Sequence, residues 1–536
     1  MTYYKKPPRK VGKHLGGTFA STRKAVENAT NHELSHYQVA IYDWLAKGTG
    51  HAIVQAVAGS GKTTTIEYAP HFLPQYASIL MVAYNKHIAD ELNARMMPEN
   101  VEASTLHSAG YKVLSKALGY IKVDENKTKW ILMNLMGYKL MQDKEEKKAF
   151  WEMYHPMHRM VDLLKNFGFY ALRPAPTPDD VIFLANRYQV ELTDNFGMFF
   201  EMLLKVMEEV KKPGEGKQKN IDWSDMLWMP LLLKLPFPKY EFVFVDESQD
   251  LNPIQIAMVR QFLSAKGRAC FVGDKNQAIY GFRGADPEAM NEINTIFNAI
   301  ELPLSISFRC PKLIVEAAKE LVPQIEASPY AYDGEIRHMN AAEFTTDVKS
   351  GDFVLGRTTA PLVRYCLQFI KLGKKACVRG RDIGQGLITT IEKIADLFPV
   401  HPLQEAIELF AAEEYAKLNK PGMGGQLLAM TDKIDTLKVL ASEITTYAGV
   451  IAKINDIFSD KVEAITLATV HRAKGLEANR IFVVRPDLLP HPLAVQEWQE
   501  EQEWHLKYVA ITRVKNGRDA SLTWVHDERG TEQQAA

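Results

Sequence analysis

The sequence has little cysteine and no long apolar run, and each absence excludes a class of protein. Its four cysteines, in 536 residues, form no C-x-x-C pair, so we expect neither a zinc site nor a disulfide framework. No stretch approaches the roughly 18 consecutive apolar residues of a transmembrane helix, so we expect no membrane partner. A reducing compartment fits this usage: the cytoplasm of a bacterial or phage-infected cell, or the nucleus of a eukaryotic one.

An excess of charge of one sign is also lacking. Lysine and arginine number 64 and aspartate and glutamate 65, which leaves a net charge of −1. Bulk charge therefore gives no argument for nucleic acid, and any such binding must use a local groove. The length predicts about three to four domains, and the apolar share of 46% is that of an ordinary globular protein.

Short apolar strands alternate with helical patterns in two regions, which predicts an α/β fold class with parallel sheets. We expect strands at 78–83, 242–245, 270–273, 352–355, 464–469, 480–484 and 521–525. The expected domains are a flexible basic tail at 1–30, a first α/β domain at 31–107 and 221–300 with a helical insertion at 108–220, a second α/β domain at 301–380 and 462–527 with a small insertion at 381–461, and a polar tail at 528–536. Solvation is the main expectation for the basic tail, and contact with nucleic acid is the alternative.

The most informative local pattern is a phosphate-binding loop. Residues 54–65 read V-Q-A-V-A-G-S-G-K-T-T-T, with Ala56 where G-x-x-x-x-G-K-[ST] has its first glycine. Lys62 can reach the β- and γ-phosphates of a nucleotide, and the Thr63 hydroxyl can bind Mg²⁺. The nucleotide contacts expected here are Ala58, Gly59, Ser60, Gly61, Lys62, Thr63 and Thr64. The alternative is a glycine-rich turn before an ordinary helix.

Carboxylates follow a second apolar strand, in F-V-F-V-D-E-S-Q-D at 242–250. The strand would project them from its carboxyl end, where open α/β sheets place ligands. We expect Asp246 to hold Mg²⁺ and Glu247 to orient and deprotonate the attacking water. A solvated strand end is the alternative.

A third strand leads into V-G-D-K-N-Q-A-I-Y-G-F-R-G-A-D at 272–286. Gln277 could sense the γ-phosphate there. Tyr280, Phe282 and Arg283 suit base stacking and backbone contact on a single strand. Taken alone, such aromatic residues more often belong to a core.

Two arginines follow apolar runs in the second region, Arg309 in L-S-I-S-F-R-C-P and Arg513 in Y-V-A-I-T-R-V. An arginine finger that stabilises charge on a transferring phosphoryl group is one interpretation. A surface ion pair is the other, and residue physics alone does not separate them.

The ordered set of segments resembles the motifs of the UvrD/PcrA/Rep group of superfamily 1 (SF1A) DNA helicases over residues 31–525. Besides the segments above, the resemblance includes V-A-Y-N-K, S-T-L-H-S and T-L-A-T-V-H-R-A-K-G-L-E-A. D-E-S-Q-D and T-x-H-x-x-K-G-L-E are the most specific signatures. The resemblance implies two RecA-like P-loop domains, each with a mainly helical insertion.

The resemblance also implies roles residue by residue. Gln38 matches a glutamine that reads adenine, and Glu477 a residue near the ribose or γ-phosphate. Lys62, Asp246, Glu247, Gln277, Arg309 and Arg513 match catalytic positions. The positions that match the single-strand groove are Tyr84, Asn85, Thr105, His107, Tyr280, Phe282, Arg283, Thr469 and His471. His471 and Lys474 could instead be structural links between a strand and a helix.

Three departures from the group stand out. Phe282 stands where relatives often have tryptophan, and the segment Y-N-K-H-I-A-D-E-L is one residue longer than in the bacterial enzymes. That spacing is similar to the F-box helicase branch. The insertion at 381–461 is much shorter than its counterpart, which puts the autoregulation and duplex contact attributed to that domain in doubt.

We therefore expect a monomeric ATP- and Mg²⁺-dependent helicase or translocase that acts on single-stranded and forked DNA, with 3′→5′ travel and replication or repair proteins as partners. The alternatives are a translocase that mainly strips proteins from single strands, a non-catalytic nucleic-acid-binding module, and an enzyme that acts on RNA.

Overall fold

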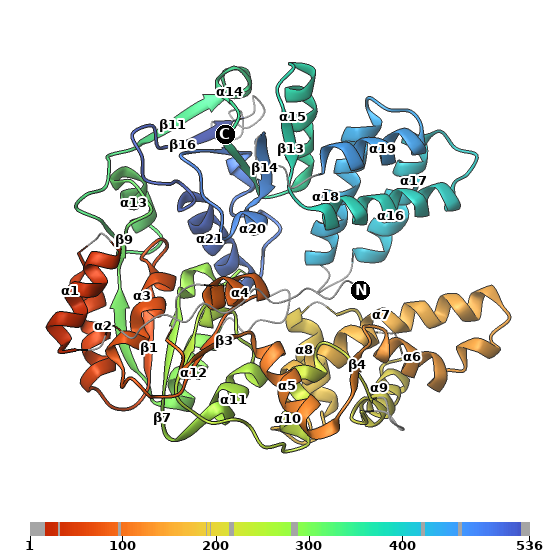
Figure 1. The fold of residues 1–536 in the computed structure, drawn as a ribbon. Coiled ribbons are helices and arrows are strands. Elements are labelled where there is room, and N and C mark those ends of the chain that lie inside the picture. The colour runs from red at the N-terminus through yellow and green to blue at the C-terminus, as the bar shows by residue number, and fades with distance from the viewer. Residues whose placement is uncertain are drawn as a thin grey trace. The chain divides into compact units, whose positions relative to one another are not determined.

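Figure 1 shows the computed structural model of the chain. The structure describes residues 15, 17–30, 33–94, 98–188, 190–192, 195–213, 219–279, 288–419, 424–458 and 464–526. By their mutual contacts, the residues form two compact units. The first extends to Leu304. The second begins at Ser305 and also includes the short segment Val57–Ser60.

The first unit is built on a six-stranded sheet in which every neighbouring pair is parallel. Its central strands are apolar and buried on both faces, as expected where helices cover a parallel sheet. In spatial order the strands are β3 (Val101–Ser104), β2 (Ile79–Val82), β6 (Tyr240–Val245), β7 (Leu263–Gly273), β1 (Ala52–Ala56) and β8 (Ile300–Leu304). Its helices are α1 (Phe19–Thr30), α2 (His36–Lys47), α3 (Lys62–Tyr68), α4 (Lys86–Ala94), α5 (Leu106–Leu118), α11 (Pro253–Phe262) and α12 (Ala289–Phe297).

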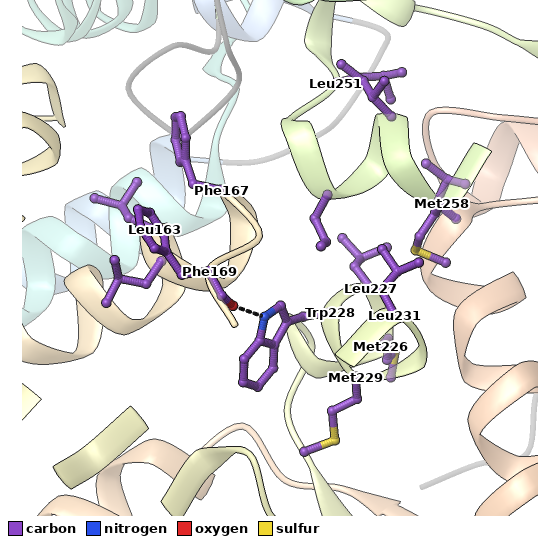
Figure 2. Packing of buried hydrophobic residues seen from close by; sticks show 14 of the residues in the cluster. Leu163, Phe167, Phe169, Met226, Leu227, Trp228, Met229, Leu231, Leu251 and Met258 are labelled. Carbon is purple, nitrogen blue, oxygen red and sulfur yellow. Dashed lines mark hydrogen bonds between the residues drawn. The ribbon is translucent and has the colours of Figure 1, made fainter. Parts of the chain in front are cut away.

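A helical insertion follows α5 and shares its core with one face of this sheet. Sheet residues such as Ile53 and Leu80 belong to the same buried cluster as Phe150 and Leu203 of the insertion. In Figure 2 the indole of Trp228 donates a hydrogen bond of 2.7 Å to the Phe169 carbonyl inside this cluster. The insertion comprises β4 (Ile121–Val123), α6 (Lys127–Leu135), α7 (Lys144–Asn166), α8 (Pro178–Tyr188), α9 (Phe196–Val210), β5 (Lys219–Ile221) and α10 (Asp225–Leu232).

The second unit has its own six-stranded parallel sheet. The spatial order is β11 (Glu335–Asn340), β16 (Ser521–His526), β15 (Arg480–Val484), β12 (Phe353–Gly356), β14 (Ile465–Thr469) and β13 (Ala376–Val378). Strands β9 (Ile306–Ser307) and β10 (Glu326–Ala327) form a separate parallel pair. The helices outside the insertion are α13 (Lys312–Lys319), α14 (Ala341–Asp347), α15 (Thr359–Lys371), α20 (Val470–Ala473) and α21 (Glu497–Ile511).

The second insertion consists of α16 (Arg381–Leu397), α17 (Leu403–Leu418), α18 (Gly424–Ala441) and α19 (Tyr447–Ile457). Its apolar residues, such as Ile391 and Leu437, lie in one buried cluster with Val354 and Leu467 of the sheet. Short 3₁₀ helices complete the chain at Ala69–Phe72, Tyr138–Leu140, Ser248–Asp250, Lys275–Gln277 and Pro486–Leu488. Among the described residues, no helix is both long and apolar enough to cross a bilayer.

The α/β class with parallel sheets and the expected strands are confirmed, but two expected boundaries are wrong. Residues 19–30 of the expected flexible tail form α1, because Val26 packs into the core of the first unit. The expected start of the second domain at 301 is four residues too early, because Ile300–Leu304 pairs with β1 as an edge strand of the first sheet. An apolar strand at a domain boundary does not reveal from its sequence which sheet it joins.

Candidate nucleotide site

The phosphate loop connects β1 to α3 and owes its shape to two glycines. Gly59 and Gly61 have φ angles of 71° and 82°, a left-handed conformation that side chains disfavour. This explains why the alanine at position 56, which ends β1, does not disturb the turn. The hydroxyl of Ser60 is buried without a hydrogen-bond partner in the described chain. An orphaned buried donor in such a loop fits a bound phosphate, since buried polar groups are normally satisfied.

The segment Val57–Ser60 is packed within the second unit. The Ala58 N–H donates to the Tyr508 hydroxyl at 2.9 Å, and the Phe308 N–H donates to the Gly59 carbonyl at 2.9 Å. A Cβ atom on Gly59 would lie 2.3 Å from the Arg309 Cβ. The close approach of Arg309 is therefore a second reason for glycine at this position.

Both expected acidic residues lie at the carboxyl end of β6. Asp246 is buried, and its Oδ1 accepts the Glu247 N–H at 2.9 Å. Glu247 has a φ of 50°, a strained conformation for a residue with a side chain. Its Oε1 lies 4.0 Å from the Lys62 ammonium nitrogen. The structure thus brings the loop lysine and the expected catalytic base together within the first unit.

Gln277 is buried after the end of β7. Its Nε2 donates to Asp274 Oδ2 at 2.6 Å. Burial raises the pKa of the Asp274 carboxyl, and this effect outweighs the opposing ones of the Lys62 ammonium and the Gln277 bond. Asp274 and Gln249 also belong to this cluster, although our sequence reasoning gave neither a role. The only signal in the sequence was the place of Asp274 in G-D-K-N-Q and of Gln249 in D-E-S-Q-D.

Gln38, the expected adenine reader, makes hydrogen bonds through both its amide oxygen and its amide nitrogen within the first unit. Its side-chain oxygen accepts the Ser35 N–H at 3.0 Å as half of a capping box at the start of α2, and its Nε2 donates to the Thr65 hydroxyl at 3.2 Å. This arrangement ties α2 to α3. An adenine contact by Gln38 stays a prediction.

The second unit groups Arg309, Glu477 and Arg513. Arg309 pairs with Glu477 at 2.8 Å, and the Lys515 ammonium lies 3.3 Å from the other oxygen of that carboxylate. Burial raises the pKa of Glu477, but the two cations outweigh it and the net shift is downward. Arg513 is 1% exposed, and its guanidinium donates to the carbonyls of Val509 and Leu476. Arg513 is therefore not a solvated surface residue, whereas Arg309 forms a partly exposed ion pair with Glu477. The role of each as an arginine finger stays a prediction.

The residues expected in the single-strand groove differ in accessibility. Tyr84 is 44% exposed and precedes α4, whereas Asn85 accepts the Ile88 N–H at 2.9 Å. Thr105 is buried as the N-cap of α5, and burial lowers the pKa of His107 in the first turn of that helix.

Thr469 ends β14 and His471 lies in α20 of the second unit. Tyr280, Phe282 and Arg283 lie outside the described residues.

The donor set for Mg²⁺ is sparse. No cluster of three or more histidine, cysteine, aspartate or glutamate side chains occurs in the part of the chain that the structure describes. Mg²⁺ keeps several waters and is usually held by one or two carboxylates together with substrate phosphates. Asp246 and the exposed Thr63 fit that kind of site, in which the nucleotide completes the coordination.

Comparison with protein-family profiles identifies the family of this chain. The profile of the UvrD/REP helicase N-terminal domain matches residues 42–298, and that of the UvrD-like helicase C-terminal domain matches residues 423–517. The chain belongs to the UvrD-like helicase family. It is therefore an ATP-hydrolysing DNA helicase of the SF1A type, as the motifs predicted.

Relatives from bacteria and eukaryotes resemble this UvrD-like helicase. The Bacillus subtilis protein YjcD is 21% identical over 87% of this chain and 76% of its own length. The F-box DNA helicase protein 1 of Schizosaccharomyces pombe is 24% identical over 86% of this chain and 54% of its own. The ATP-dependent DNA helicase PcrA of Staphylococcus aureus is 24% identical over 51% and 38%, respectively. The chain thus spans about half or less of the last two.

Proposed function

We propose that this UvrD-like helicase uses ATP hydrolysis to move along single-stranded DNA and to separate duplex ahead of it. The observation that carries the proposal is the set of charged and polar groups that each unit holds by itself. The first unit supplies Lys62, Glu247 and Gln277, and the second supplies Arg309 and Arg513. These are groups that phosphoryl transfer uses: a lysine and a base in the first unit, and two guanidinium groups in the second.

In the proposed reaction, Glu247 orients a water molecule whose oxygen bonds to the γ-phosphorus as the bond to the β–γ bridging oxygen breaks. The water proton passes to Glu247, and ADP and phosphate leave. Lys62 neutralises the phosphates, and Arg309 and Arg513 stabilise the charge on the transferring group. Thr63 and Asp246 would hold Mg²⁺, which would supply positive charge to neutralise the phosphates.

Phe308 adds a residue that our sequence reasoning missed. Its ring is 40% exposed and directly precedes Arg309, and its backbone donates to the phosphate loop. An exposed ring at that place offers a stacking face for the nucleobase. It is an alternative to Gln38, whose amide is already engaged.

The direction of travel, and the choice between duplex unwinding and protein stripping, need a direct test. Strand displacement from forked DNA with a 3′ or a 5′ single-stranded arm, measured under single-turnover conditions, should proceed only from the 3′ arm. Displacement of streptavidin from biotinylated single strands, without unwinding of either fork, would instead favour the protein-stripping alternative. The small second insertion, packed into the core of its domain, is the observation that keeps this alternative open.

A further inference from the structure

We propose that Gln249 is a positioning residue that links the base Glu247 to the γ-phosphate sensor Gln277, so that the two act on ATP as one assembly. The inference rests on the proposed hydrolytic function. It assigns a role to the glutamine of D-E-S-Q-D, which neither contacts nucleotide nor transfers a proton in the mechanism above.

Three hydrogen bonds connect the two catalytic side chains within the first unit. Gln249 Nε2 donates to Glu247 Oε2 at 2.5 Å. The Asp274 N–H donates to Gln249 Oε1 at 3.0 Å, and Asp274 Oδ2 accepts from Gln277 Nε2 at 2.6 Å. A backbone N–H can only donate and a carboxylate can only accept, so the Gln249 amide has one orientation that satisfies both neighbours.

The packing holds this amide in place. Gln249 is 1% exposed, and a Cβ atom on Gly273 would lie 2.6 Å from its Oε1 and 3.1 Å from its backbone nitrogen. Any larger residue at 273 would push Gln249 away from Glu247. The absence of a side chain at the end of β7 is thus what allows the ends of β6 and β7 to approach through this glutamine.

The hydrogen bond from Gln249 to Glu247 also controls the direction in which the Glu247 carboxylate points. Glu247 has a strained φ of 50°, and such residues persist only where their surroundings hold them. Gln249 holds Oε2, while Oε1 is the oxygen 4.0 Å from Lys62 Nζ. Rotation of the carboxylate is thereby restricted. When Gln277 moves to engage the γ-phosphate, Asp274 and Gln249 transmit this movement to Glu247.

The decisive variant is Gln249→Glu, which has nearly the same shape but lacks the N–H donor. It also places a carboxylate beside Glu247, in a site that already holds Lys62, Asp246, Asp250 and Asp274. We expect kcat for DNA-stimulated ATP hydrolysis to fall about 10- to 100-fold, below the full contribution of a general base, with little change in KM for ATP.

Gln249→Met keeps the bulk without donor or charge. It should lower kcat similarly with little change in KM for ATP, and it decides the question if Gln249→Glu does not fold. The matched control is Gln261→Glu, the same change on the exposed end of α11, which should behave as wild type.

A wild-type kcat in the Gln249 variants, with Glu247→Gln inactive, would overturn the linking role alone. A rise in KM for ATP together with a fall in kcat would indicate a structural role for Gln249 and would also overturn the linking role. An inactive wild-type protein would instead contradict the proposed function itself.

Discussion

Removal of one lysine from the first insertion should loosen the core that this insertion shares with the first sheet. Lys165 is completely buried, 2.7 Å from Asp222 Oδ2 and 2.8 Å from Asp225 Oδ1. Lys127 lies 2.6 Å from the other Asp225 oxygen, so two cations balance two anions. Burial alone would lower the pKa of Lys165, but Asp225 and Asp222 outweigh it and raise the pKa. Lys165 is therefore charged at neutral pH.

The magnitude follows from this balance. Lys165→Met keeps a similar chain length but leaves one buried negative charge without compensation, which typically costs about 3–5 kcal/mol. Addition of Asp222→Asn restores neutrality, and the double variant should regain about 1–3 kcal/mol, as expected for directly coupled neighbours. Asp222 is the suitable partner because Asp225 would remain paired with Lys127.

Native-state hydrogen exchange measures this cost locally, which matters because a chain with two units need not unfold in one step. In Lys165→Met, the free energy of the opening that exposes the α7 amides should be about 3–5 kcal/mol lower than in wild type. In the double variant this opening free energy should be partly restored. Peptides from the second unit serve as the internal control. Unchanged protection of α7, or equal loss in both variants, would refute the reasoning that a buried charge imbalance dominates.

Four further outcomes are expected. Lys62→Ala should abolish ATP hydrolysis in a steady-state phosphate-release assay, and retained turnover would remove Lys62 from the site. Arg309→Ala should lower kcat about 10³-fold or more, as loss of an arginine finger does, without preventing ATP binding measured by fluorescence titration; an unchanged kcat would reduce Arg309 to the partner of Glu477. Asp222 has its pKa lowered, because the lysine charges outweigh the opposing effect of burial; its stabilisation is therefore present above its unfolded pKa of about 4 and is lost at lower pH. Protection of α7 should hold from pH 8 to about pH 5 and fall below pH 4, and a flat profile would contradict this assignment. Phe282→Ala should weaken the stimulation of ATPase by single-stranded DNA by about 1–3 kcal/mol of lost stacking, whereas full stimulation would place Phe282 in the core.

The sequence was sufficient for those parts that depend on local patterns. Buried strands followed at once by Asp246 and Glu247, or by Gly273 and Asp274, predicted where the carboxyl ends of β6 and β7 lie. The spacing of Gly59, Gly61 and Lys62 predicted a phosphate-binding loop, and the structure adds that both glycines have left-handed φ angles. In these cases a few neighbouring residues determine the outcome.

Features that depend on contacts between distant segments were not predictable. The hydrogen bonds that join Glu247, Gln249, Asp274 and Gln277 cross from one strand end to another, and no spacing rule announces them. The balance of Lys127 and Lys165 with two aspartates spans 98 residues from Lys127 to Asp225. Likewise, the membership of β8 in the first sheet depends on its pairing with β1 rather than on its own residues.

The central claim is that Glu247 is the base of an ATPase that single-stranded DNA stimulates. The direct measurement is phosphate release by wild type and Glu247→Gln, with and without single-stranded DNA, beside nucleotide binding by both proteins. The account predicts DNA-stimulated hydrolysis by wild type, and ATP binding without hydrolysis by Glu247→Gln. Hydrolysis by Glu247→Gln at the wild-type rate, or a wild-type rate that DNA leaves unchanged, would contradict it.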